Sequence, residues 1–432
     1  MAVIWDERRA SSPAFFCLYF CCMQCVFEAY SLCMYTQQTG GEGRMGLIGQ
    51  QVTVLGAGVA GLAVARALAL RGSVVTVLEQ ADAIREVGAG VQVSPNGARV
   101  LRALGLSLPG LRADAVELRD GLTGGLVTRL EVARLRPDQA YHLMHRAELI
   151  DLLLQGAREA GVMVRLLSRV VSVNLSGARP VAVLEDGTRH EAALMIGADG
   201  LQSQMRAALN GQVAPFFTHQ VAWRALIPGD GGAAVAEVHM APGRHLVSYP
   251  VRGGTLRNIV AVEERRQWVE EGWSLRDDPM AMQLAFRGFS ARARNWLDQV
   301  QDVWLWGLFR HEVARVWQRG LPDGSVAIVG DAAHPMLPFL AQGASMALED
   351  AWVLAASLAE GGAGLAGYQA ARAGRCARVV AAATANARAY HLGGMARGVA
   401  HLGLRVGGRL APGLALRRYD WLYGMDVTQG SG

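Results

Sequence analysis

Short apolar runs alternate with helical stretches from residue 51 onward. Residues 52–55 form an aliphatic, partly β-branched run, which is typical of a buried parallel strand. Residues 62–70 are rich in Ala and Leu and predict a helix that ends at Gly72. A second apolar run follows at residues 74–78. This order of strand, helix and strand predicts a βαβ unit and therefore a parallel sheet.

The turn between the first strand and this helix carries three glycines. Gly56 permits a tight turn, Gly58 lets a pyrophosphate approach the backbone, and Gly61 lets the helix pack close to the strand. The helix N-terminus presents unpaired N–H groups and a partial positive charge to phosphates. Glu79 ends the second strand, where a carboxylate can accept hydrogen bonds from a ribose. The segment predicts a dinucleotide site; the motif alone fits both FAD and NAD, and an ordinary glycine-rich turn is the alternative.

The middle and the end of the chain follow different patterns. Four short apolar runs, split by Gly and Pro turns, predict the strands of a mostly antiparallel sheet. After residue 355 the chain is helical and rich in Ala and Arg. The four predicted strands are residues 222–227, 236–240, 245–249 and 258–263.

The first 44 residues differ in composition from the rest. Residues 14–35 are apolar and hold five of the six cysteines. A membrane anchor, a secretory signal and a metal site are alternatives. However, Gln24 and Glu28 interrupt the apolar stretch, no cleavage site is evident, and the cysteine spacing matches no zinc pattern. We expect a poorly ordered extension or a mis-assigned start, with Met45 as the natural one.

The composition of the whole chain narrows the class of protein. With 432 residues, 51% of them hydrophobic, the chain can build two or three domains. All 42 basic residues are arginines and they are scattered, which argues against a nucleic-acid partner. The net charge of +5 favours anionic ligands. Outside the first 44 residues only Cys376 remains, so we expect a cytoplasmic protein without stable membrane insertion.

Two further motifs each follow an apolar run. Residues 195–206 contain an Asp-Gly pair that begins at Asp199, and residues 326–350 contain a Gly-Asp pair that ends at Asp331. With the glycine turn, these motifs resemble the aromatic-ring hydroxylases, a family of single-component flavoprotein monooxygenases, over about residues 50–426. Within that family the chain looks closest to salicylate hydroxylase, 3-hydroxybenzoate 6-hydroxylase and 6-hydroxynicotinate 3-monooxygenase.

The resemblance implies FAD as the bound cofactor and NADH or NADPH as a transient co-substrate. It assigns cofactor contacts to Asp199, to Asp331 on the ribityl chain, and to Arg146 at a helix start. It also places Gly343 and Ala344 at a helix N-terminus that faces the flavin, where negative charge is stabilised. No metal site is expected.

The loop after Asp331 and the segment that passes the flavin also match the family. Pro335 and Pro338 are expected to hold the loop extended, and His334 to fix it by hydrogen bonds. Gln92 stands where some family members carry histidine, so an acid–base role at that position is in doubt.

The predicted strand at residues 245–249 provides candidate catalytic residues. Side chains alternate across a strand, so His245, Val247 and Tyr249 share one face. The resemblance implies that His245 accepts the proton of a substrate hydroxyl and that Tyr249 orients the substrate or its carboxylate. Gln342, beside the flavin edge, is a further candidate for substrate contact. The alternative is that His245 and Tyr249 only fill a strand face.

The resemblance also implies the fold and its division into domains. We expect an α/β fold (α+β overall) of the p-hydroxybenzoate hydroxylase type. In it a Rossmann-type FAD domain is interleaved with an antiparallel-sheet substrate domain and followed by a C-terminal helical segment. That last segment is interpreted as packing or as the contact of a homodimer. The boundaries are residues 50–215 and 305–385 for the FAD domain, 216–304 with a contribution from 115–140 for the substrate domain, and 386–432 for the helical segment.

These observations predict an NAD(P)H-dependent flavoprotein monooxygenase. It would use O2 to hydroxylate a small aromatic substrate, phenolic or hydroxybenzoate-like, through a flavin hydroperoxide. One alternative is an oxygenase of the same superfamily that acts on a quinone precursor or an alkene. The others are a flavin dehydrogenase or oxidase without oxygen insertion, and a non-catalytic flavin-binding protein.

Overall fold

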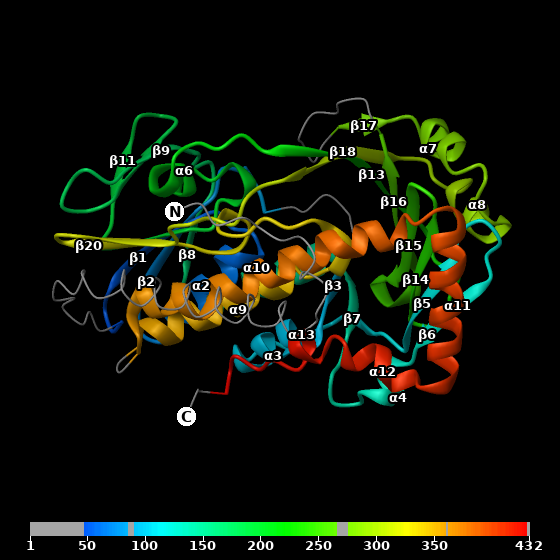
Figure 1. Cartoon of the computed structure of the whole chain (residues 1–432). Coiled ribbons are helices and arrows are strands. Elements are labelled where there is room, and N and C mark those ends of the chain that lie inside the picture. Colours follow the sequence, from blue (N-terminus) through cyan, green and yellow to red (C-terminus); the bar gives the residue numbers. More distant parts are fainter. Residues whose placement is uncertain (1–46, 85–89, 266–274, 360–361, 430–432) are drawn as a thin grey trace, which may run out of the picture. The chain divides into compact units, whose positions relative to one another are not determined.

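The computed structural model describes residues 47–84, 90–265, 275–359 and 362–429 (Figure 1). The predicted N-terminal extension, residues 1–44, lies outside the described residues. Within the described ranges, no helix combines the length and the apolar character that crossing a membrane requires.

A six-stranded sheet forms the first core layer, in the order β19-β20-β12-β1-β2-β8. Strand β1 (Gln51–Leu55) lies between β2 (Val74–Leu78) and β12 (Leu194–Gly197) and is parallel to both. Four of the five residues of β1 are buried, because a parallel strand is covered on both faces. The predicted parallel sheet is confirmed, except that the edge strand β19 pairs antiparallel with β20. Its other strands are β8 (Met163–Arg165), β19 (Gln318–Leu321) and β20 (Gly324–Ile328).

Helix α2 (Val59–Ala69) is almost completely buried beside this sheet. It begins directly after Gly58, three residues earlier than predicted, because the glycine turn itself supplies the first helical turn. Small side chains on α2 let α5 (Arg146–Glu159) and α9 (Gly343–Leu358) pack against it. The long helix α10 (Gly364–Tyr390) lies along α9 (Figure 1).

An eight-stranded sheet forms the second layer, in the order β17-β18-β13-β16-β15-β14-β5-β6. All its neighbours pair antiparallel except β14 and β5, which are parallel. The mostly antiparallel sheet predicted from the sequence is therefore confirmed. Its strands are β5 (Ala115–Asp120), β6 (Leu126–Leu130), β13 (Phe216–Pro228), β14 (Val235–Ala241), β15 (Arg244–Val251), β16 (Leu256–Glu264), β17 (Arg276–Asp277) and β18 (Val303–Arg310).

The strand pairings of this sheet can be compared with the predicted domain boundaries. Strands β5 and β6 come from the segment 115–140 and extend the sheet beyond β14. The predicted boundary between residues 304 and 305 falls inside β18, which pairs with β13 along its length. The described residues all fall in one compact unit, and the division into domains remains a prediction.

Two smaller sheets and several further helices complete the described structure. Strands β3 (Gly90–Val93), β4 (Leu111–Arg112) and β7 (His142–His145) form one three-stranded sheet, and β9 (Val170–Asn174), β10 (Val181–Leu184) and β11 (Arg189–Glu191) form another. The remaining helices are α3 (Pro95–Ala103), α4 (Val132–Leu135), α6 (Gln204–Asn210), α7 (Pro279–Ala285), α8 (Ala291–Leu297), α11 (Gly394–Leu410), α12 (Pro412–Arg417) and α13 (Asp420–Tyr423). Short 3-10 turns occur at η2 (Gly200–Gln202), η3 (Arg252–Gly254), η4 (Gly330–Ala332) and η5 (Pro338–Leu340).

The loop after Asp331 is less extended than predicted. Pro338 opens the 3-10 turn η5 instead of prolonging an extended segment. The fixed φ of proline suits the first position of a helical turn, where its missing N–H costs no hydrogen bond.

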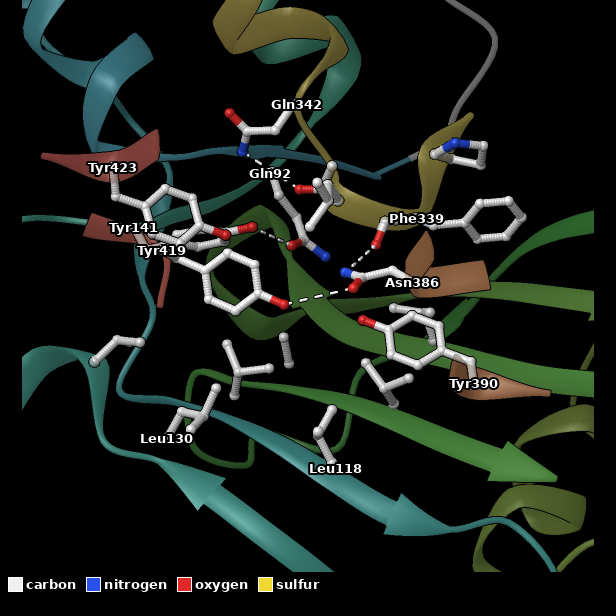
Figure 2. A pocket seen from close by; sticks show the side chains of 18 of the residues that line it. Gln92, Leu118, Leu130, Tyr141, Phe339, Gln342, Asn386, Tyr390, Tyr419 and Tyr423 are labelled. Carbon is white, nitrogen blue, oxygen red and sulfur yellow. Dashed lines mark hydrogen bonds between the residues drawn. The ribbon is translucent and has the colours of Figure 1, made fainter. Parts of the chain in front are cut away.

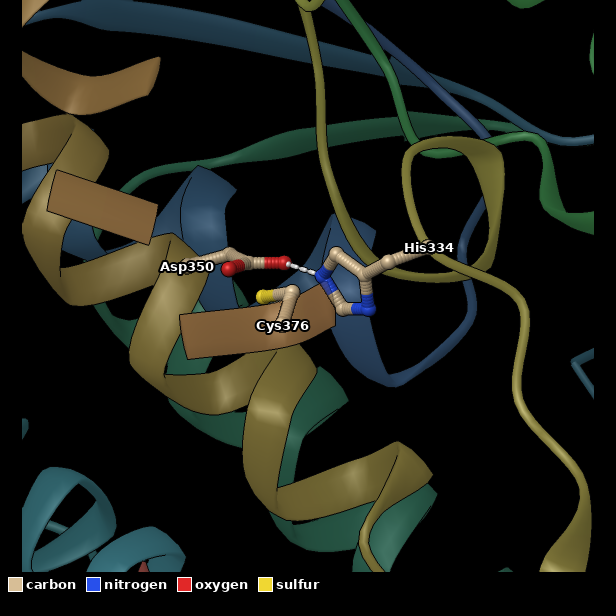
Figure 3. Close-up of side chains that lie close together, drawn as sticks. All are labelled: His334, Asp350 and Cys376. Carbon is tan, nitrogen blue, oxygen red and sulfur yellow. Dashed lines mark hydrogen bonds and ion pairs between the residues drawn. The ribbon is translucent and has the colours of Figure 1, made fainter. Parts of the chain in front are cut away.

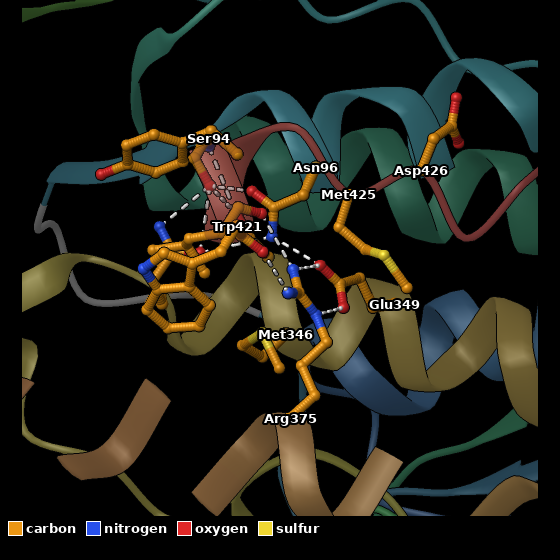
Figure 4. Close-up of polar contacts among 12 residues, drawn as sticks. Ser94, Asn96, Met346, Glu349, Arg375, Trp421, Met425 and Asp426 are labelled. Atoms are coloured by element: carbon orange, nitrogen blue, oxygen red, sulfur yellow. Dashed lines mark hydrogen bonds and ion pairs between the residues drawn. The ribbon is translucent and has the colours of Figure 1, made fainter. Parts of the chain in front are cut away.

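Buried charges join α9, α10 and the loop that contains η4. Arg372 of α10 donates from Nε to Asp350 Oδ1 at 2.7 Å and also pairs with Glu349. Arg375 donates to both Glu349 oxygens, each at 2.8 Å (Figure 4). Asp350 further accepts the backbone N–H of Gly330 at 2.9 Å. Glu349, Asp350 and Arg372 are almost fully excluded from solvent, so each charge depends on its partners.

His334 belongs to the same network. Its Nε2 pairs with Asp350, with Cys376 beside them (Figure 3). Burial opposes the charged ring, but Asp350 and Cys376 together outweigh burial and raise the pKa of His334 well above 6.5. His334 thus fixes the loop, as predicted.

Replacing Arg372 with Met should strongly destabilise the protein. The change leaves two buried carboxylates short of a partner, which costs about 3–5 kcal/mol in comparable ion pairs. Urea unfolding would measure the loss. Arg388→Met, at an exposed position of the same helix, is the matched control and should change the free energy of unfolding by less than about 0.5 kcal/mol. Equal stability of both variants would refute a supporting role for the network.

Candidate active site

A large cavity of about 1280 Å³ is lined by residues of the eight-stranded sheet, of the turns that follow strands of the six-stranded sheet, and of the C-terminal helices (Figure 2). This exceeds the range of roughly 300–1,000 Å³ typical for one small ligand. The cavity therefore has room for a large cofactor and a small substrate together. Gly58 and Ala198 line one part of it, and His245 and Tyr249 line another.

The glycine turn has the geometry of a cofactor cradle. Gly56 has a φ of +97°, and a Cβ there would lie 2.6 Å from the carbonyl oxygen of Ala198. A Cβ on Gly61 would lie 1.9 Å from the carbonyl oxygen of Gly56, so only glycine lets α2 approach the turn. Gly58, in contrast, lines the cavity and faces open space. The turn thus leaves a gap where a pyrophosphate would lie, which fits a bound dinucleotide.

Glu79 secures this turn. One of its carboxylate oxygens accepts the N–H of Ala57 at 2.7 Å, and the other accepts the N–H of Ala81 at 2.9 Å. The carboxylate is thereby held at the carboxyl end of β2, the position from which ribose hydroxyls are bound in such folds. Its contact with a ribose remains a prediction.

The Asp-Gly motif mainly supports its own helix. Asp199 accepts hydrogen bonds from Ser203 Oγ and from the backbone N–H of Gln204 at 2.8 Å. Its neighbours Ala198 and Gly200 line the cavity, whereas Asp199 itself does not. A cofactor would therefore contact the backbone of these neighbours and not the carboxylate of Asp199. The predicted role of Asp199 in binding FAD therefore remains a prediction.

Arg206 links this motif to the Gly-Asp motif. Its guanidinium donates to the carbonyl oxygen of Ala332 in η4 at 3.2 Å and to that of Glu312. Arg206 thus holds the loop that carries Asp331. Asp331 lines the cavity together with Arg146, at the start of α5. Burial raises the pKa of Asp331, although His334 and Arg146 lower it.

Helix α9 directs its N-terminus at the cavity. Gly343 and Ala344 line the cavity, and a Cβ on Gly343 would meet no atom within 4 Å. Gln342 precedes them, but its amide nitrogen donates to Ser94 Oγ at 3.0 Å and its oxygen accepts from Asn96 at 3.3 Å. The side chain of Gln342 is thus engaged by the protein, and its predicted contact with substrate remains a prediction.

Strand β15 carries the predicted substrate residues. His245, Val247 and Tyr249 all line the cavity, in agreement with their alternation along the strand. Burial, and to a lesser extent the nearby His391, holds the pKa of His245 well below 6.5. Burial raises the pKa of Tyr249, so its hydroxyl stays protonated.

A wall of tyrosines, which was not predicted from the sequence, borders the cavity. Tyr390, Tyr419 and Tyr423, from the C-terminal segment, line the cavity with Tyr141 (Figure 2). Tyr141 donates to Gln92 at 2.8 Å, which gives Gln92 a binding partner in place of an acid–base role. The interpretation of the C-terminal segment as packing or as a homodimer contact is therefore incomplete, because the segment also lines the cavity. The aromatic residues spaced four apart at its end were the available signal.

One buried cluster has the composition of a metal site. Ligand atoms of His334, Asp350 and Cys376 lie within 4.8 Å of one another. However, Asp350 already pairs with Arg372 and with His334, and a protonated imidazole cannot bind a cation. Among the described residues, this cluster is explained as an ion pair.

Comparisons with known proteins agree with the geometry. Residues 50–385 match a family described as FAD binding domain. A 3-hydroxybenzoate 6-hydroxylase from Polaromonas naphthalenivorans is 33% identical over 398 residues, covering 87% of this chain and 96% of that one. A 3-amino-4-hydroxybenzoate 2-monooxygenase from Streptomyces platensis is 32% identical over 400 residues, covering 88% and 96%.

Solved structures share the fold. Klebsiella pneumoniae HpxO, crystallised with FAD and uric acid, matches with a TM-score of 0.73 at 23% identity, covering 84% of this chain and 95% of that one. A salicylate hydroxylase substrate complex matches with a TM-score of 0.70 at 25% identity, covering 88% and 96%.

The fold, the cavity and these relatives define an FAD-dependent monooxygenase that uses NAD(P)H, of the aromatic hydroxylase class. The chain belongs to the FAD binding domain family of these enzymes. The predicted fold class, enzyme class and cofactor are confirmed. FAD binding fits the residues present, since the cradle around Gly58 is open where a cofactor must approach.

Replacing Gly58 with Ala should weaken FAD binding about tenfold or more without unfolding the protein. The new methyl group meets no protein atom, but it occupies the approach of the pyrophosphate. Quenching of flavin fluorescence would measure the affinity, and circular dichroism the fold. Gly374→Ala on α10, also without a contact at its Cβ, is the control and should bind FAD normally. Unchanged affinity in Gly58→Ala would exclude this cradle as the pyrophosphate site.

Proposed function

We propose that the enzyme hydroxylates a small phenol that carries an anionic group, such as a hydroxybenzoate. The observation that carries this proposal is the face of β15, where a histidine, a valine and a tyrosine line one cavity together. Along a strand the Cα atoms of His245 and Tyr249 are about 13 Å apart. Val247 lies between them on the same face, so the three side chains border a stretch of the cavity long enough for a single aromatic ring.

Each part of the cavity has its own task in this proposal. Bound FAD supplies the redox chemistry, taking a hydride from NAD(P)H and activating O2. The N-terminus of α9 stabilises negative charge beside it, an effect of up to about 2 kcal/mol in partly buried sites. Apolar side chains such as Leu118, Leu130 and Met240 exclude water from the reacting ring.

His245 acts as the base in this proposal. Its lowered pKa keeps the imidazole neutral at physiological pH, so a nitrogen lone pair is available. Transfer of the phenol proton to this nitrogen gives a phenolate, which is a stronger nucleophile than the phenol.

Tyr249 orients the other end of the substrate. Its hydroxyl stays protonated and can donate to a carboxylate. Arg224 also lines the cavity and lies close enough to influence the pKa of Tyr249. Positive charge at this end favours an anionic substituent, in agreement with the net charge of +5.

The named relatives support this substrate class. The two relatives are named for hydroxybenzoates, and one matching structure holds a salicylate hydroxylase with its substrate. Oxygenation of a quinone precursor or an alkene is the second candidate. It is less favoured, because such a substrate would give His245 no proton to accept. A cytoplasmic location and a homodimer also remain part of the proposal.

The substrate class can be tested on the purified full-length chain loaded with FAD. NADH and NADPH oxidation would be followed with salicylate, hydroxybenzoates and hydroxypyridine carboxylates, and product masses measured alongside. We expect at least one phenolic acid to stimulate oxidation and to gain one oxygen atom. Stimulated oxidation without any gain of oxygen would indicate a dehydrogenase or an oxidase instead.

The base can be tested with His245→Gln. In the unmodified enzyme kcat/KM should stay level down to about pH 6, because the low pKa of His245 keeps it neutral. In the variant, kcat/KM should rise about tenfold per pH unit toward the phenol pKa of about 10, since only ionised substrate reacts. His142→Gln, outside the cavity-lining set, is the control. A level profile in His245→Gln would contradict the assignment.

A further inference from the structure

Three side chains connect the cavity to the protein surface. His245 Nδ1 lies 2.7 Å from His391 Nε2, and His391 Nδ1 lies 2.7 Å from Glu264 Oε1. The two rings are almost fully buried, whereas the Glu264 side chain is 53% exposed. The three residues come from β15, from the end of α10 and from β16, so tertiary packing alone assembles the row.

The carboxylate determines the tautomers of both rings. Glu264 accepts a hydrogen bond, so His391 carries its proton on Nδ1 and presents a lone pair at Nε2. His245 must then donate from Nδ1 to that lone pair. Its Nε2 is left without a proton, and it is the ring atom still available to a substrate hydroxyl. The row thus prepares His245 as an acceptor before any substrate binds.

We propose that His391 and Glu264 form a relay that carries the substrate proton from His245 to solvent. This inference rests on the proposed function. The substrate O–H bond breaks with its electrons left on oxygen, and the proton binds His245 Nε2. The Nδ1 proton of His245 passes to His391 Nε2, and the Nδ1 proton of His391 passes to Glu264 and on to water. The same path in reverse returns a proton to the product and resets both tautomers.

The surroundings of the two histidines favour transfer of the proton to solvent, because neither ring holds an extra proton readily. Burial lowers the pKa of His245 and of His391, and Glu264 only partly offsets this for His391. Imidazolium therefore does not accumulate at neutral pH. Phe339 and Tyr390 contribute rings that pack against His245, and Tyr390 stays protonated because burial raises its pKa.

Neighbouring charges on β15 and β16 are engaged elsewhere. Arg244 and Arg265 both pair with Glu263, one residue before Glu264 on β16. In strand β14, the residue opposite His245 is the uncharged Met240. Glu263 therefore provides a matched control, since it has the same charge and the same strand but no contact with His391.

Glu264→Gln tests the relay, with Glu263→Gln beside it. Histidine ¹⁵N NMR on the FAD-loaded chain should show the His391 pKa falling in Glu264→Gln and unchanged in Glu263→Gln, because Glu264 raises it. Stopped-flow mixing with a phenolic substrate and a pH indicator should show proton release slowed at least about tenfold in Glu264→Gln alone. An unchanged titration of His391, or unchanged proton release, would overturn the relay.

A second variant distinguishes a role of His391 in proton transfer from a purely structural role. His391→Ala opens a space beside His245, and added imidazole should restore the rate of proton release in proportion to its concentration. Absence of rescue in a folded, FAD-loaded variant would also overturn the relay. Failure of the proposed function has a different signature: no phenol binds or reacts in the unmodified enzyme, while the NMR titration still decides whether Glu264 and the two rings are coupled.

Discussion

The buried carboxylates of α9 are the constraint on which the active site depends. Glu349 and Asp350 lie at the centre of the FAD-binding core, where each requires cationic or N–H partners. The partners come from three places: arginines of α10, Asn96 at the start of α3, and the backbone of the loop that carries Asp331. None of these segments can shift without leaving a charge unpaired. The groups that surround the cofactor are therefore fixed relative to one another.

Local sequence was sufficient to predict the strands, the turn and the helices around the expected cofactor site. The glycine turn, the apolar strands around it and the helix after Gly343 depend on neighbouring residues, and the structure places them within a few positions of the prediction. The errors at this end were also local. Gly58 starts its helix early, and Pro338 opens a turn where an extended loop was expected.

The substrate end could be predicted only in part, because its contacts join distant segments. The strand period identified the shared face of His245 and Tyr249, but His391 lies 146 residues from His245 along the chain. The hydrogen bond from the amide of Gln342 to Ser94 likewise joins residues 248 positions apart, and it was not predicted. Such pairings leave no periodic signal. They become visible only when the two sheets and the C-terminal helices are placed together.

The tyrosine wall also affects how the protein is made. In chain order the cavity-lining residues run from Gly58 to Tyr423. During synthesis the earlier walls can fold as they emerge, but the cavity remains open on one side until α13 leaves the ribosome. A nascent chain can therefore present the glycine turn to FAD long before it can enclose an aromatic substrate. Premature termination within the last helices would yield a flavin-binding protein with an exposed reaction centre.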